Sequence, residues 1–97
     1  MAVYFTIAGT NFRHGTEFFK EGMKVKLAKE PDNEFDNEAI KIELPGMGKV
    51  GYVANSVRTR IGDSSSAGRI YDQIGDTAEG TVLYILEDGV VCELALA

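Results

Sequence analysis

The sequence is poor in reactive side chains, with a single cysteine, Cys92, a single histidine, His14, and no tryptophan. One cysteine excludes a disulfide bond within the chain and fits a reducing cytoplasm. Cys92 and His14 stand far apart in the sequence, and no motif beside either one would activate it. We therefore expect no catalytic residues and no cofactor. Cys92 is interpreted as a small core residue or a half-buried strand residue, and His14 as an exposed loop residue.

Long hydrophobic runs are also missing. No stretch approaches the ~20 apolar residues that a membrane-spanning helix needs. The N-terminal residues lack a basic segment and alternate between apolar and polar, which is unlike a signal peptide. We therefore expect a cytoplasmic protein that does not associate with membranes.

An excess of positive charge is the third absence. The chain has 10 lysine and arginine residues against 15 aspartate and glutamate residues, which gives a net charge of −5. Proteins that wrap duplex DNA neutralise many phosphates and show a basic footprint. The composition therefore argues against duplex wrapping. A small pocket for one or two nucleotides remains compatible with it, because local potential matters more there than net charge.

The 97 residues predict one domain over residues 1–97 with one modest core. Apolar and polar residues alternate, as in half-buried strands, over residues 3–9, 23–29, 39–44, 49–53, 77–86 and 90–96. Asp88-Gly89 predicts a hairpin between the last two strands. Residues 57–61 and 67–74 are expected to be short helices, capped by Asn55 or Ser56 and by Ser66, with Gly75 at the C-cap of the second. The predicted fold class is mostly β with two short helices, as a small six-stranded antiparallel barrel.

The alternation also predicts which side chains face the core. In the first strand, Val3, Phe5 and Ile7 lie on one face and Tyr4 and Thr6 on the other, and only one side of the strand is expected to be buried. The residues expected together in one core are Val25, Leu27, Ile40, Ile42 and Val50.

Residues 30–40, with the sequence EPDNEFDNEAI, form the most informative stretch. Pro31 prevents the preceding strand from continuing. A single aromatic, Phe35, then stands among the carboxylates Glu30, Asp32, Glu34, Asp36 and Glu38. One interpretation is a solvated turn whose Phe35 packs back onto the core. The other is a binding loop that presents a ring face beside a carboxylate acceptor.

The acidic residues of this stretch have a spacing similar to that of a calcium-binding loop. Asn37 occupies the sixth position, where such loops carry glycine, and no helix is expected before it. We therefore expect no metal site.

Several motifs carry a family resemblance in combination: IAGT at 7–10, Gly15, GMKVKL at 22–27, KEPDNEFDNEAIKI at 29–42 and GKVGYV at 48–53. Together they resemble the HIRAN domain family, and the short chain looks like the standalone bacterial members. The resemblance implies a six-stranded barrel related to the OB-fold. It also implies a module that binds the free 3′-OH end of single-stranded DNA, in the handling of DNA damage or stalled replication forks.

The resemblance extends to individual residues. Phe12 and Phe35 match the aromatics that stack on the terminal bases, Asp36 matches the carboxylate that accepts the terminal hydroxyl, and Asn33 matches a polar pocket residue. Asn11 and Asn55 stand where DNA-binding members carry basic residues for the phosphates. Arg13 and Lys49 are the candidates to replace them.

Two functional hypotheses follow. The first is a non-enzymatic module that binds a single-stranded DNA end through the residues named above. The alternative is a protein-interaction or self-associating module that has lost DNA binding, which the acidity of the chain and the asparagines at positions 11 and 55 favour.

Overall fold

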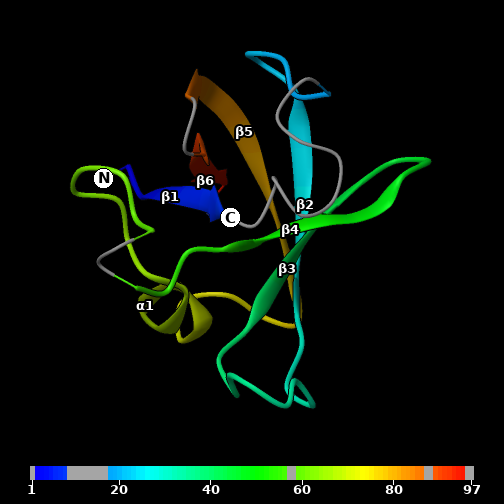
Figure 1. The fold of residues 1–97 in the computed structure, drawn as a ribbon, viewed down its shortest axis with the longest axis vertical. Coiled ribbons are helices and arrows are strands. Elements are labelled where there is room, and N and C mark those ends of the chain that lie inside the picture. Colours follow the sequence, from blue (N-terminus) through cyan, green and yellow to red (C-terminus); the bar gives the residue numbers. More distant parts are fainter. Residues whose placement is uncertain (1, 9–17, 57–58, 87–88, 96–97) are drawn as a thin grey trace.

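The computed structural model describes residues 2–8, 18–56, 59–86 and 89–95. Within them it contains six strands and one short helix, in the order β1 (Tyr4–Ala8), β2 (Lys24–Lys29), β3 (Ile40–Leu44), β4 (Gly48–Val53), α1 (Ala67–Tyr71), β5 (Thr77–Leu86) and β6 (Gly89–Ala95). The strands close into an antiparallel barrel with the order β1-β4-β3-β2-β5-β6 (Figure 1). The prediction of a mostly β, six-stranded barrel is therefore confirmed.

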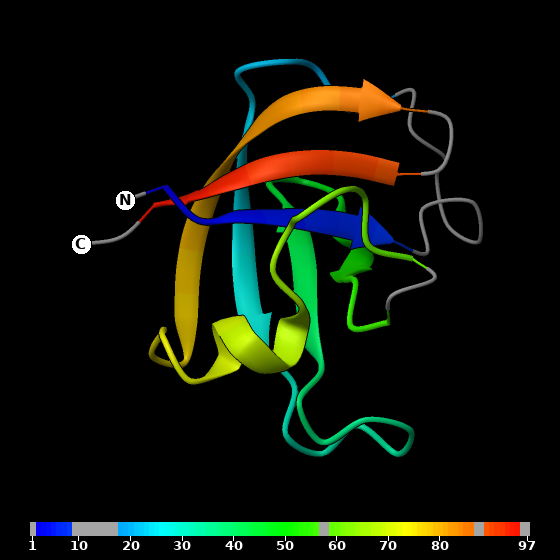
Figure 2. The same cartoon turned by 90° about the vertical axis from the view of Figure 1, so that its left-hand side faces the viewer.

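The barrel is closed through one long strand and one short pairing. β5 is the longest strand and pairs with both β2 and β6, so that it curves along one side of the molecule (Figure 2). Among the described residues, β1 and β4 share the pairs Ile7–Val53 and Ala8–Tyr52. The amide of Ala54 extends this short seam by donating to the Thr6 carbonyl at 2.8 Å.

The barrel interior holds an apolar cluster. All five residues expected to share one core, Val25, Leu27, Ile40, Ile42 and Val50, belong to it. Cys92 on β6 is fully buried there, which confirms the first of its two interpretations, and α1 adds Ala67 and Ile70. The period-two alternation thus identified the inward face of these strands correctly.

The helix predictions were only partly right. Ser66 caps α1 by accepting a hydrogen bond from the Arg69 amide, as expected, but the helix ends at Tyr71 with Asp72 as its C-cap. Residues 57–58 of the other expected helix lie outside the described residues, and residues 59–61 are not helical. The amides of Thr59 and Arg60 both donate to the Ser56 carbonyl, which closes one turn without continuing it. The backbone then turns to β1 instead, where the Ile61 amide donates to the Thr6 hydroxyl.

The expectation that the outer face of β1 is solvated was wrong at Thr6. Thr6 is fully buried, and its Oγ1 lies 2.8 Å from the Oγ of Ser64. The Ser65 amide donates to the Tyr4 carbonyl at 2.7 Å, so residues 61–65 run along the outside of β1. Residues 61–65, which are distant in sequence, therefore cover the outer face of β1, which the alternation alone predicts to be exposed to solvent.

Candidate functional site

The loop between β2 and β3 is held in shape by the side chain of Asn33. Its Nδ2 donates to Glu30 Oε1 at 2.8 Å, and its Oδ1 accepts from the amides of Phe35 at 2.9 Å and Asp36 at 3.0 Å. This is the turn-forming behaviour expected of an asparagine side chain. At the base of the loop, the Glu30 amide donates to the Ala39 carbonyl.

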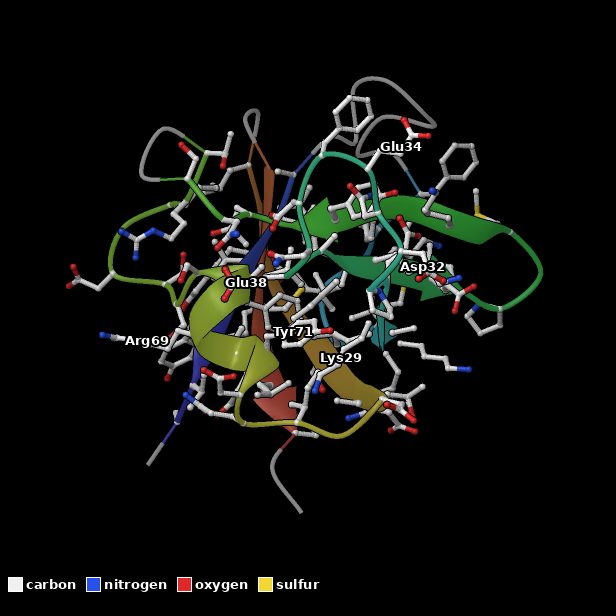
Figure 3. All side chains as sticks on the ribbon, turned by 90° about the horizontal axis from the view of Figure 1, so that it is seen from below. Lys29, Asp32, Glu34, Glu38, Arg69 and Tyr71 are labelled. Carbon is white, nitrogen blue, oxygen red and sulfur yellow. The ribbon has the colours of Figure 1, made fainter. Side chains whose placement is uncertain are left out.

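The loop presents Phe35 to solvent. Its side chain is 93 % exposed, although it is a large hydrophobic residue. The interpretation in which Phe35 packs back onto the core is therefore wrong. Figure 3 shows Asp32 and Glu34 on the same loop, and Phe35 stands between Glu34 and Asp36 in the sequence.

Asp36 connects the loop to the rest of the molecule through both carboxylate oxygens. Oδ1 accepts from the Glu38 amide, and Oδ2 accepts from Nδ2 of Asn55, each at 2.9 Å. Asn55 in turn accepts from the Gly68 amide of α1 at 2.8 Å. Because a carboxylate oxygen can accept more than one hydrogen bond, Asp36 retains acceptor capacity for a ligand.

Helix α1, which donates this hydrogen bond to Asn55, is itself held against the barrel. Lys29 Nζ lies 4.3 Å from the Tyr71 ring centroid and donates to the Ile74 carbonyl at 2.9 Å (Figure 3). The Glu38 carboxylate rests on Gly68, where an added Cβ would approach its Oε1 to 2.7 Å. The hydrogen bonds from Asp36 through Asn55 therefore lead to a helix that Lys29 and Glu38 hold against the barrel.

These elements enclose a cleft of about 460 Å³, which we call the Phe35 cleft. It is lined by Ala8, Asn33, Phe35, Asp36, Ala39, Tyr52, Val53, Ala54, Asn55 and Thr59. Four residues predicted from the sequence, Asn33, Phe35, Asp36 and Asn55, thus come together. The predictions for Asn11, Phe12, Arg13 and His14 fall on residues 9–17, outside the described part of the chain.

Tyr52 and Thr59 line the cleft but were not predicted as site residues. The hydroxyl of Tyr52 donates to Glu30 Oε1 at 2.9 Å and accepts from Lys49 Nζ at 2.7 Å. The sequence signal for Tyr52 was its place in the GKVGYV motif. Lys49, which the sequence left unplaced, also forms an ion pair with Glu30 at 3.8 Å.

This network keeps Glu30 ionised. The Asn33 hydrogen bond is the main cause that lowers the pKa of Glu30 below its ordinary value of 4.5, and the Tyr52 hydrogen bond and the Lys49 and Lys41 charges act in the same direction. Partial burial opposes them. An ionised Glu30 holds both Asn33 and Tyr52 in place beside the cleft.

The cleft has little positive charge. No lysine or arginine is among its described lining residues.

The described ranges contain no group of three histidine, cysteine or acidic side chains that could hold a metal ion. No helix in the same part of the chain is long and apolar enough to cross a membrane.

The structure is thus a small closed β-barrel with a cleft beside the loop between β2 and β3. The sequence matches the family model of the HIRAN domain over residues 1–94, and the chain therefore belongs to the HIRAN domain family.

Two solved structures share its fold. The crystal structure of the HIRAN domain of human HLTF has a TM-score of 0.68 at 17 % identity, covering 96 % of this chain and 72 % of that one. A protein from Lactobacillus plantarum has a TM-score of 0.66 at 21 % identity, covering 97 % of this chain and 93 % of that one. The comparison with curated proteins found no match.

Proposed function

We propose that this protein is a non-enzymatic module that binds the free 3′-OH end of single-stranded DNA in the Phe35 cleft. The observation that carries the proposal is the exposed ring of Phe35 directly beside the Asp36 carboxylate in one cleft. Membership of the HIRAN family supports this ligand, since the resemblance of these two residues implies it. We place the activity in the handling of DNA damage or stalled forks.

Each of the two groups has a distinct role in the proposed complex. Phe35 stacks on a terminal base, an interaction worth ~1–3 kcal/mol that needs no base sequence. Phe12 supplies a second ring from the segment after β1. Asp36 accepts the hydrogen bond of the terminal hydroxyl and repels a terminal phosphate, so it selects an unphosphorylated end.

The asparagines support the site without neutralising phosphates. Asn33 shapes the loop, and Asn55 holds Asp36 Oδ2 through its amide. Lys49 is engaged with Glu30 and Tyr52, and Arg13 is the remaining cation proposed for a phosphate. We therefore expect weak binding with a shallow dependence on salt, because few counterions are released.

The test is fluorescence anisotropy at low salt, with short single-stranded oligonucleotides that end in 3′-OH or in 3′-phosphate. We expect the 3′-OH end to bind more tightly. Phe35→Ala should weaken both ligands by ~1–3 kcal/mol. Asp36→Ala should remove the preference between the two ends.

Asn55→Ala is the matched control for Asp36→Ala. It removes the same hydrogen bond between the two side chains but leaves the carboxylate in place. Asn55→Ala should therefore retain a preference for 3′-OH even if affinity falls. Failure of the folded protein to bind either oligonucleotide at low salt would exclude this function.

The second candidate is a protein-interaction or self-associating module. The absence of lysine and arginine from the described lining of the cleft favours it, as does the acidic loop around an exposed phenylalanine. Sedimentation velocity at increasing concentration tests self-association. Under this alternative, Phe35→Ala should abolish any dimer, while oligonucleotides should leave its population unchanged.

A further inference from the structure

A second cleft lies on the outside of the barrel, away from the residues that line the Phe35 cleft. It measures about 260 Å³ and is lined by Tyr4, Ile61, Asp63, Ser64, Leu83, Tyr84 and Val91. We call it the tyrosine cleft. It shares no lining residue with the Phe35 cleft, so the two can be tested separately.

Strand register brings the two tyrosines to this face. Val91 of β6 pairs with Thr6 of β1 on one side and with Tyr84 of β5 on the other. A register shift in β5 between Val82 and Tyr84 interrupts the regular alternation there. Tyr84 is 60 % exposed and Tyr4 43 % exposed.

The polar groups of these tyrosines are available to a ligand. Within residues 2–8, 18–56, 59–86 and 89–95, neither hydroxyl has a hydrogen-bond partner. The faces of exposed aromatic rings attract cations through the ring quadrupole. Two accessible tyrosines in one cleft thus offer both ring faces and hydroxyl acceptors.

Two carboxylates of described residues lie on the same surface. Asp63 lines the cleft, and Glu93 is paired in register with Tyr4. Neither carboxylate forms an ion pair with a described residue.

Two described cations, Arg60 and Lys24, donate to neutral oxygens instead. Arg60 donates to the Ser64 carbonyl at 2.8 Å. Lys24 donates at 2.8 Å to the hydroxyl of Thr81, the residue that pairs with Glu93. Among the described residues, Asp63 and Glu93 therefore have no cationic partner and can face a cationic ligand.

We infer that the tyrosine cleft binds an arginine side chain from a basic segment of a partner protein. A guanidinium group is planar, stacks on aromatic faces and carries five N–H donors, which suit two tyrosine hydroxyls and the Asp63 carboxylate. A phosphate-bearing ligand would instead face two carboxylates. The net charge of −5 adds long-range attraction for a basic partner.

The experiment is an amide NMR titration of the whole chain with a short peptide of alternating glycine and arginine. The expected result is saturable shifts at Tyr4, Asp63, Tyr84 and Val91, with none at Asn33 or Asp36. The same peptide with lysine should bind more weakly, and one with glutamate should not bind. Absence of saturable shifts at low salt would overturn the inference.

Substitutions distinguish the contributions of the Tyr84 ring and the Asp63 charge to peptide affinity from effects on folding. Tyr84→Ala should lower affinity about two- to fivefold, the range for an exposed cation–π contact, while Tyr84→Phe keeps the ring face and most of the affinity. Asp63→Asn should lower it up to about fivefold. If Tyr84→Ala fails to retain the dispersion of the folded spectrum, Asp63→Asn and Tyr84→Phe decide the outcome.

Glu34→Gln is the matched control, because it removes the same charge from an exposed position outside the tyrosine cleft. It should leave peptide affinity unchanged. An equal loss in Glu34→Gln and Asp63→Asn would mean non-specific charge attraction and would overturn the inference. Equal shifts of the cleft amides by a single-stranded oligonucleotide would assign the surface to nucleic acid instead.

Discussion

Asn33 shows how one side chain can determine the form of a binding loop. Its amide group donates to Glu30 and accepts from two backbone amides, so the short loop needs no apolar anchor of its own. Phe35 is consequently free to face solvent, since the turn that carries it is stabilised by hydrogen bonds rather than by burial of the ring.

The hydrogen bond from Asn33 to Glu30 predicts that the stability of the protein depends on pH. Because the folded-state pKa of Glu30 is lowered, the unfolded chain takes up its proton first as the pH falls. The stabilising contribution of Glu30 should be complete above about pH 4.5 and should be lost as the pH falls through the lower folded-state pKa. Carboxylate NMR titration measures the folded-state pKa of Glu30, and unfolding curves at several pH values measure the free energy of unfolding.

Asn33→Ala provides the control for this prediction. It removes the largest cause of the shift, so the pKa of Glu30 should move back toward 4.5. In Glu30→Gln, the corresponding part of the pH dependence of the unfolding free energy should disappear. A Glu30 pKa that is the same with and without Asn33 would contradict this account.

At the scale of elements, Gly80 reveals how closely β5 passes the core. A Cβ at Gly80 would lie 2.8 Å from Cζ of Phe5 and 3.2 Å from the Glu93 carbonyl oxygen. Phe5 is fully buried, so its ring has little room to move aside. Glycine at this position permits the contact between β5 and the ring.

We therefore expect Gly80→Ala to destabilise the protein by ~1–3 kcal/mol, the usual range for overpacking a core. Gly75→Ala is the matched control, because a Cβ there would meet nothing within 4 Å. Denaturant unfolding of both variants measures the difference. Equal stability of the two would show that β5 can shift away from Phe5 without loss.

The elements also show which features the sequence could predict. Alternation identified the strands and the buried set that includes Ile42, because each strand has one face on the core. It failed at Thr6, because residues 61–65 cover that face and nothing local signals such a cover. The same segment engages β1 through its backbone, which explains why residues 59–61 do not form the expected helix.

For the candidate site, residue types were predictable but their partners were not. The resemblance named Asn33, Phe35, Asp36 and Asn55, and these residues do line one cleft. From the sequence, Asn55 is a candidate helix cap and stands in place of a basic residue, whereas in the structure it connects Asp36 to α1. Such a connection depends on the approach of elements far apart in sequence, which residue spacing does not encode.

At the scale of the whole molecule, β6 lies between two neighbouring strands of the closed barrel. Among the described residues, β1 and β4 share two residue pairs, whereas β6 pairs with both β1 and β5 over most of its length. Cys92 lies on β6, fully buried between these neighbours. Its burial therefore reports whether the barrel is closed.

We propose that residues 1–97 form a single domain that unfolds as one cooperative unit. Burial raises the pKa of the Cys92 thiol to about 12, so almost no reactive thiolate exists in the closed barrel at neutral pH. Opening of the barrel should expose the thiol to a reagent such as a dithiobis-nitrobenzoate. Thiol reactivity and far-ultraviolet circular dichroism should then change at the same denaturant midpoint. Reaction of Cys92 well below the circular dichroism midpoint would show instead that β6 opens separately and that the molecule is not one cooperative unit.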